Sequence, residues 1–233
     1  MKKNSKKEVI VLSLGGSLII PEEIDLKFLR EFKKIILRNI KKHKFLIVCG
    51  GGSIARKYIY ALRNEKLAEK LQSFAGISAT RTNARFMTYF FNKDAEYGIP
   101  HTKKTLKKYL RKHDVVFCGA LEYKPEQTSD STAAELARIF KTEFLNLTNV
   151  SGLYNKNPKE HKDAKQIPRI NWEQFQKLAG KSKYQPGQHF VLDQTAAEII
   201  RKNKINTYIL GKDLKQLENV LRKKKFKGTL ISQ

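Results

Sequence analysis

Two glycine-rich turns are the parts of this chain best suited to chemistry. Residues 50–52 are glycines that follow a short apolar run, and Ser53 then opens a pattern with helical spacing. The first N–H groups of a helix lack internal partners, and the helix dipole adds positive potential there. Because glycine has no Cβ, a phosphate can approach this backbone closely. Arg56, one helical turn later, adds a planar guanidinium that suits phosphate oxygens. The turn therefore predicts a phosphate site.

Two simpler interpretations of the same turn stay open. The glycines could serve only a tight connection between a strand and a helix. They also fit the dinucleotide-binding pattern G-x-G-x-x-A through Gly50, Gly52 and Ala55, with Glu69 near the place of a ribose-binding acid. A pattern this short is weak evidence by itself, so other parts of the chain have to decide.

Other predicted strands also end in small or polar residues. Residues 15–17 read Gly-Gly-Ser after the first strand, Gly119 follows a later one, and Thr148 and Asn149 follow another. Ligands of open α/β sheets bind beyond the carboxyl ends of the strands. Two separate glycine turns suit two phosphate-bearing ligands better than one dinucleotide, and such a pair suits phosphoryl transfer. The chain has no G-x-x-x-x-G-K-[ST] sequence, which excludes a P-loop kinase.

Buried strands that alternate with amphipathic helices predict the elements that position these turns. The expected strands are 9–14, 45–49, 115–118, 144–147, 207–210 and 228–231. The expected helices follow Asp25 up to residue 40, start at Ser53, and cover 66–91, 103–112, 133–140, 172–180, 193–203 and 214–222. This alternation predicts an α/β fold, a three-layer sandwich with a mostly parallel central sheet. We expect a basic tail over residues 1–7 and a single domain over 8–233.

Composition narrows the class of protein. The chain has 233 residues, a net charge of +25 and no apolar run long enough to span a membrane. Cys49 and Cys118 each end an apolar run, which indicates buried thiols in a reducing cytoplasm. The scattered histidines make a zinc site improbable. The lysines are spread over many predicted helices, so solvated outer faces are favoured over dedicated nucleic-acid binding, which stays an alternative.

The ordered set of motifs resembles the amino-acid kinase family, and within it the UMP kinases of the archaeal type. The motifs are strand-G-G-S, strand-G-G-G-S-x-x-A-R, S-D-S-T-A-A and T-N-V-x-G-L-Y, together with residues 79–84 and 193–197. The resemblance covers residues 8 to 231. It implies an ATP-dependent kinase that phosphorylates UMP, uses Mg²⁺ and forms a homohexamer in the cytoplasm. It also implies an acceptor side at 8–125 and an ATP side at 126–233.

The resemblance also implies roles for individual residues. The ATP-binding set is Gly15, Gly16, Ser17, Gly52, Arg56, Thr148, Asn149, Tyr154 and Asn157. The UMP-binding set is Gly51, Ser73, Gly119, Gln127, Thr128 and Ser129. Arg56, Asp130 and Asp193 are the expected catalytic residues, and Mg²⁺ is carried mainly by nucleotide phosphates, with no protein ligand assigned. The simpler alternatives are helix N-caps for the two aspartates, ordinary packing for Tyr154, and helix-face or subunit contacts for Thr80, Arg81 and Asn83.

Several positions depart from the family pattern. Ser13 stands where many relatives have a lysine, which matches the archaeal type, and Ser73 stands where the family has an aspartate at the nucleoside. Ser151 and Asn157 replace acidic residues, and the loop 120–126 is longer than usual. These departures keep two further hypotheses open, namely a kinase for another small phosphate or carboxylate and a weakened nucleotide-binding regulator.

Overall fold

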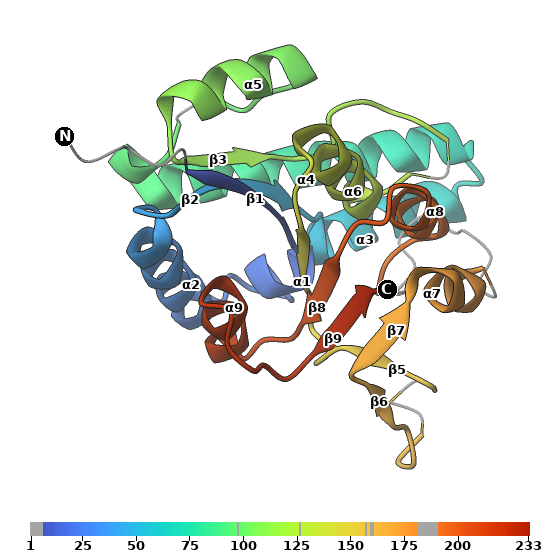
Figure 1. The fold of residues 1–233 in the computed structure, drawn as a ribbon. Helices are drawn as coiled ribbons and strands as arrows, with labels where there is room; N and C mark the ends of the chain where they lie inside the picture. Colours follow the sequence, from blue (N-terminus) through green and yellow to red (C-terminus); the bar gives the residue numbers. More distant parts are fainter. Residues whose placement is uncertain (1–6, 97, 126, 157, 159–160, 181–190) are drawn as a thin grey trace.

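A sheet of seven strands forms the middle layer of the protein (Figure 1). The computed structural model describes residues 7–96, 98–125, 127–156, 158, 161–180 and 191–233. The strand order is β3-β2-β1-β4-β8-β9-β7, and every pair is parallel except the antiparallel β8 and β9. The strands are β1 (Glu8–Leu14), β2 (His43–Cys49), β3 (Val115–Cys118), β4 (Phe144–Leu147), β7 (Arg169–Asn171), β8 (Thr207–Leu210) and β9 (Thr229–Ser232). A separate antiparallel pair is formed by β5 (Leu153–Tyr154) and β6 (Gln166–Ile167).

Helices cover both faces of the sheet, because alternate residues of each strand point to opposite sides. One core holds the inward residues of α1 (Gly16–Ile19), α2 (Leu26–Asn39), α4 (Glu69–Phe91) and α9 (Leu214–Leu221). The opposite core holds those of α5 (Lys103–Lys112), α6 (Ser129–Phe140), α7 (Trp172–Ala179) and α8 (Gln194–Lys202). The helix α3 (Gly52–Asn64) packs on α4. The prediction of a three-layer α/β sandwich with a mostly parallel sheet is confirmed.

Most predicted elements are present, and the exceptions have local causes. Asp25 caps α2 by accepting from the N–H of Phe28 at 3.1 Å, as its sequence position indicates. The expected start of a helix at residue 133 is wrong, because α6 begins at Ser129 with Thr128 as its cap. The short α1, β7 and the β5–β6 pair were not predicted. Elements of two to four residues are too short to show a hydrophobic period.

Two expectations from composition can be compared with the structure. Cys49 and Cys118 are free and fully buried, and burial raises the pKa of Cys118 to about 12. None of the helices in the described ranges is both long and apolar enough to cross a membrane. Residues 1–6 of the expected basic tail lie outside the residues that the structure describes.

Candidate active site

The two glycine turns touch each other at the carboxyl edge of the sheet. Gly15 follows β1 and donates its N–H to the carbonyl of Leu147 at 2.9 Å. Gly50 follows β2 and donates to the carbonyl of Leu14 at 2.9 Å. A Cβ added at Gly16 would lie 2.0 Å from the backbone nitrogen of Gly52, so only glycine allows this approach. The turns are therefore neighbours through their backbones, with no side chain between them.

The second turn leads directly into α3. Gly51 is the N-cap residue of α3, and no side chain of the described residues caps this helix end. Gly52 has a φ of +64°, in the left-handed region that favours glycine. Ser53 is 2% exposed, and its hydroxyl has no hydrogen-bond partner within the described parts of the chain. An uncapped helix start with an unpaired buried hydroxyl fits the predicted phosphate site.

The helix α4 holds this turn and the loop that follows β3. The side-chain amide of Asn83 donates to the carbonyl of Gly50 at 2.7 Å and is 4% exposed. The hydroxyl of Thr80 accepts from the N–H of Ala120 at 3.0 Å. Arg81 donates to the carbonyls of residues 120 and 121 at 3.1 and 2.6 Å. The sequence interpretation of these side chains as helix-face or subunit contacts missed this positioning role. Their polar character on a helix near strand ends was the available signal.

Replacing Asn83 by alanine tests whether α4 supports the glycine turn. The carbonyl of Gly50 would lose its buried donor, so we expect the free energy of unfolding to fall by about 1–3 kcal/mol. Thermal denaturation measures this change. Thr82→Ala on the exposed side of α4 removes only a bond to the carbonyl of Ser78 and is expected to have little effect. Equal losses in both variants would contradict the assignment.

Asp130 lies at the start of α6 and faces the first glycine turn through Ser13. The fully buried hydroxyl of Ser13 donates to one carboxylate oxygen of Asp130 at 2.7 Å. Burial, reinforced by the nearby Asp193, raises the pKa of Asp130 to about 7, although the Ser13 hydrogen bond opposes the shift. Among the described residues no donor reaches its second oxygen. Asp130 therefore offers one free carboxylate oxygen to a bound cation.

Asp193 is instead satisfied by protein donors. It accepts from the hydroxyl of Thr128 at 2.5 Å, from the N–H and hydroxyl of Ser131 at 3.2 and 2.6 Å, and from the N–H of Ala196 at 2.7 Å. The side chain is 3% exposed and caps α8. These contacts join the start of α6 to the start of α8. The geometry gives Asp193 a positioning role, and its expected catalytic role stays a prediction.

We expect the hydrogen bonds that join Asp193 to the starts of α6 and α8 to contribute measurably to the free energy of unfolding. In Asp193→Asn, an amide N–H₂ would face at least one donor that now points at a carboxylate oxygen. We expect the variant to lose about 2 kcal/mol of unfolding free energy, measured by denaturant titration. At a temperature where the variant is folded, a positioning role predicts that most activity survives. A folded variant without activity would instead support the catalytic role.

Arg56 lies on α3, and its side chain contacts the segment that follows α1. Its guanidinium donates to the carbonyl of Pro21 at 3.2 Å and lies 4.0 Å from the carboxylate of Glu22. The N–H of Ser53 donates to the carbonyl of Ile20 at 3.2 Å, which fixes the segment after α1 against the start of α3. The structure thus places the guanidinium of Arg56 against the segment after α1, and Ser17 lies within α1, which begins at Gly16.

The expected acceptor residues lie on α4, on the loop after β3 and at the start of α6. Ser73 is partly exposed on α4, next to Phe74, whose ring stacks edge-on against Tyr123 at 5.1 Å. Lys70 lies over both rings, 5.8 and 5.9 Å from their centroids. This contact places Tyr123, in the loop that follows Gly119, beside the part of α4 that carries Ser73, while Thr128 and Ser129 lie at the start of α6. Residues 119–123 therefore lie against α4, although the sequence alone placed them only after a strand.

The expected ATP residues lie at the end of β4 and beyond. Thr148 donates its N–H to the carbonyl of Leu210 at 2.9 Å, and its hydroxyl lies 3.5 Å from the side-chain oxygen of Asn149. Tyr154 is partly exposed in β5. Asn157 lies outside the described residues. Because β4 is next to β1 in the sheet, Thr148 and Asn149 share an edge with the first glycine turn.

The carboxylates near the glycine turns suit an Mg²⁺ ion that is bound mainly by the phosphates of a nucleotide. In the described part of the chain, no group of three or more His, Cys, Asp or Glu side chains could hold a metal ion. Mg²⁺ is commonly bound through one or two carboxylates together with substrate phosphates. The free oxygen of Asp130 matches that requirement.

Comparisons with known proteins agree with the geometry. A uridylate kinase of Thermococcus kodakarensis is 32% identical over 95% of this chain and 98% of its own length, and one of Thermoplasma volcanium is 34% identical over 97% and 98%. The crystal structure of uridylate kinase from Archaeoglobus fulgidus is similar, with a TM-score of 0.82 and 31% identity over 97% of this chain and all of that one. The model of the amino acid kinase family matches residues 8–211. The chain therefore belongs to the amino acid kinase family.

Proposed function

We propose that this protein is an ATP-dependent kinase that transfers the γ-phosphoryl group to UMP and forms UDP. The observation that carries the proposal is the contact between the two glycine turns, where a Cβ at Gly16 would meet the backbone of Gly52 at 2.0 Å. If each turn bound one phosphate-bearing ligand, the phosphate groups of the two ligands would lie next to each other, as phosphoryl transfer requires. The archaeal relatives that match nearly the whole chain are named uridylate kinases.

The reaction needs positioning and charge stabilisation more than covalent chemistry. An oxygen of the UMP phosphate attacks the γ-phosphorus in line, and the bond to the bridging oxygen breaks to release ADP. Backbone N–H groups of the two turns and the guanidinium of Arg56 stabilise the charge on the equatorial oxygens. Bound Mg²⁺ supplies further charge neutralisation. Asp130 would hold the cation of the donor phosphates through its free oxygen, and Asp193 keeps the starts of α6 and α8 in place.

The two ligands would occupy opposite sides of the turns within a single domain. UMP binds on the side of residues 8–125, against Gly51, Ser73 and the loop 119–129, with Thr128 and Ser129 near its phosphate. ATP binds on the side of residues 126–233, against Thr148, Asn149 and Tyr154, with Asn157 as a further contact. The start of α6 at Ser129 supports a phosphate role for these hydroxyl groups, because backbone N–H groups point outward there.

An acceptor panel tests the function. Purified protein with ATP and Mg²⁺ is offered UMP, CMP, AMP, acetate and isopentenyl phosphate, and ADP formation and the phosphorylated product are measured. We expect UDP as the main product. Activity on another acceptor with none on UMP would overturn the proposal in favour of a kinase for that acceptor. Ser73, which stands where the family has an aspartate at the nucleoside, is the reason to test other acceptors. Nucleotide binding without turnover at any Mg²⁺ concentration would favour a weakened regulatory protein.

We also propose that the protein is a cytoplasmic homo-oligomer, a hexamer by its resemblance to the family. Exposed large hydrophobic side chains gather on α3, α4 and their connection, namely Tyr58, Tyr60, Leu67, Leu71, Phe74 and Tyr89. Exposed apolar side chains concentrated on two helices that pack together indicate an interaction surface. Light scattering after gel filtration is expected to give six times the 26.9 kDa mass of the chain. Tyr60→Glu is expected to shift the protein toward smaller species, and a monomer of wild-type protein would contradict the proposal.

A further inference from the structure

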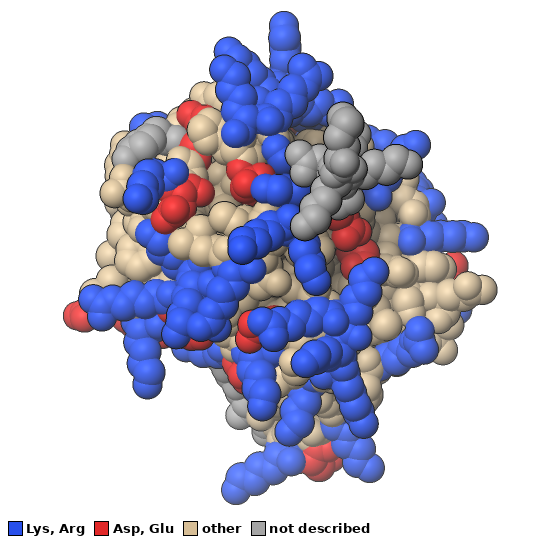
Figure 2. Space-filling model, turned by 60° about the vertical axis from the view of Figure 1, so that its left-hand side comes forward, with Lys and Arg blue, Asp and Glu red and all other residues tan. Residues whose placement is uncertain are grey.

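A strongly cationic face lies away from the candidate active site. It is formed by α2 and by the end of α9, and we call it the α2–α9 face. Its exposed cationic side chains are Lys27, Arg30, Lys34, Arg38, Lys41, Lys42, Arg222, Lys223, Lys224 and Lys225. Figure 2 brings this side of the molecule forward and shows lysine and arginine side chains predominating over acidic ones. Such a face attracts polyanions, and its layout decides which kind.

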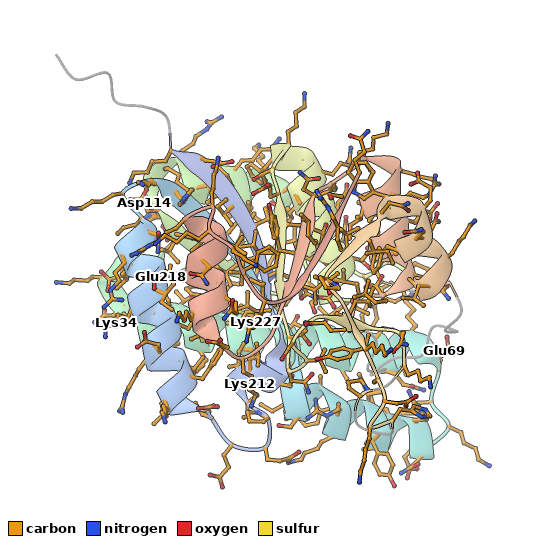
Figure 3. The ribbon with its side chains drawn as sticks, turned by 60° about the horizontal axis from the view of Figure 1, so that its bottom comes forward. Lys34, Glu69, Asp114, Lys212, Glu218 and Lys227 are labelled. Atoms are coloured by element: carbon orange, nitrogen blue, oxygen red, sulfur yellow. The ribbon has the colours of Figure 1, made fainter. Side chains whose placement is uncertain are left out.

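The two cationic segments form one continuous surface. The helices α2 and α9 pack side by side, with Lys34 on α2 and Glu218 on α9 (Figure 3). His43 lies between the end of α2 and the end of α9. Burial lowers the pKa of His43; Glu8, 3.7 Å from the ring, opposes this shift, and Lys42 and Lys223 reinforce it. The positive charge therefore continues from α2 onto residues 222–225.

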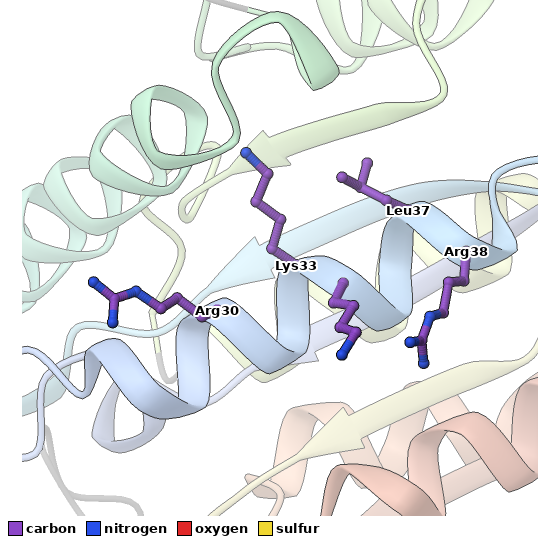
Figure 4. Close-up of a pocket in the computed structure, with 5 residues that line it drawn as sticks. Arg30, Lys33, Leu37 and Arg38 are labelled. Carbon is purple, nitrogen blue, oxygen red and sulfur yellow. The ribbon is translucent and has the colours of Figure 1, made fainter.

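A shallow groove on α2 lies within this face (Figure 4). It has a volume of about 500 Å³ and is lined by Arg30, Lys33, Lys34, Leu37 and Arg38. Lys33 is occupied by the protein itself, because it donates to the carbonyls of residues 90 and 91 at 3.1 Å and pairs with Asp94 at 3.4 Å. The other three cations project into solvent.

Those three cations are available and regularly spaced. Arg30 and Arg38 have no acidic partner within the described residues, and Lys34 has only a loose contact of 3.9 Å with Glu31. They follow one another at intervals of four residues, which places successive cations about 6 Å apart along the helix. Each can therefore contact a different phosphate of a polymer. Guanidinium groups bind phosphate oxygens through paired hydrogen bonds.

We propose that the α2–α9 face binds the phosphate backbone of a nucleic-acid duplex through Arg30, Lys34 and Arg38. A duplex fits better than a single strand, because residues 27–42 and 212–227 expose no large aromatic side chain on which bases could stack. Leu26, at the start of α2, is the one large aliphatic side chain that α2 and residues 212–227 expose, and a single such side chain inserts little apolar area into a lipid surface, so a membrane is a poorer partner. Binding is independent of base sequence and of the kinase reaction.

Fluorescence anisotropy with a labelled duplex tests the proposal over a series of KCl concentrations, with DNA and RNA duplexes as separate arms. The variant R30Q/K34Q/R38Q is expected to bind roughly tenfold more weakly or worse at moderate salt. Its plot of log affinity against log salt should be shallower by about 3, because three phosphate contacts are lost. Its melting temperature and kinase activity should match those of the wild type.

A matched variant on another helix shows whether duplex binding depends on the α2–α9 face or only on the net charge of the protein. K104Q/K107Q/K108Q removes the same charge from exposed positions on α5 and is expected to keep most of the affinity and the salt slope. Equal weakening by both variants would overturn the proposal, since binding would then report net charge alone. Tighter binding to a single strand of the same length, or to anionic phospholipid vesicles, would also overturn it, as would a lack of duplex binding at physiological salt.

Discussion

Replacing Gly16 by alanine is expected to reduce kcat/KM for UMP phosphorylation about a hundredfold or more. The new Cβ would lie 2.0 Å from the nitrogen of Gly52, 2.6 Å from its Cα and 2.7 Å from the carbonyl carbon of Gly50. All three atoms belong to the backbone, so the overlap cannot be relieved by a side-chain rotation. The turns must move apart, and a displacement near 1 Å between reacting groups can cost a factor of about 100.

A second glycine-to-alanine variant shows whether the loss of activity in Gly16→Ala comes from the contact between the turns or from the substitution of any glycine. Gly180→Ala lies at the end of α7, where φ is −67° and the nearest neighbour of an added Cβ is 3.3 Å away. It is expected to retain nearly full activity. Gly16→Ala is also expected to lose about 1–3 kcal/mol of stability from overpacking, so its kinetics are measured well below its melting temperature. Wild-type activity in folded Gly16→Ala would show that the contact between the turns does not matter for the reaction.

Asp130→Asn is expected to lower kcat about a hundredfold or more while stabilising the protein at neutral pH. The amide can still accept the hydrogen bond from Ser13, so the local structure is preserved. It cannot, however, offer a negative charge to the cation that the donor phosphates would carry, and such an electrostatic contribution is worth a factor of about 100 to 1,000. Asp114→Asn, directly before the amino end of β3 and therefore at the opposite edge of the sheet, removes the same charge and is expected to leave kcat unchanged.

The stability effect of Asp130 depends on pH in a defined direction. Burial raises its pKa from 3.8 to about 7, so the folded protein holds this proton more tightly than the unfolded chain. The contribution of this group to the unfolding free energy therefore falls as pH rises from about 4 to about 7. Asp130→Asn lacks that contribution, so its melting temperature relative to wild type is expected to increase across this window. A difference that is constant with pH would contradict the assigned pKa.

The fold was largely predictable because its signals are local. Continuous apolar runs marked β1, β2, β3, β4 and β8, and capping residues such as Asp25 and Thr102 marked helix starts. The two glycine turns were recognised for the same reason, since each directly follows an apolar strand. Their mutual contact followed from parallel strands that end at one edge, and β1 and β2 are indeed neighbours.

The supporting contacts could not be predicted, because they join residues far apart in the chain. Asp193 binds Ser131 across 62 positions, and Asn83 binds the turn at Gly50 across 33. Either side chain alone reads as a helix cap or as a polar residue on a helix face. The contact between Phe74 and Tyr123, which brings the loop to Ser73, likewise depends on how α4 lies on the sheet. A single sequence does not show such pairs.

The most direct test of the two-turn account is a crystal structure with UMP and a non-hydrolysable ATP analogue bound together with Mg²⁺. We predict that the UMP phosphate and the γ-phosphate of the analogue lie within hydrogen-bonding distance of the backbone at residues 15–17 and 50–53, with the guanidinium of Arg56 beside them. The same structure would show which group contacts the uracil near Ser73. A complex in which either phosphate binds away from these turns would contradict the proposed mechanism.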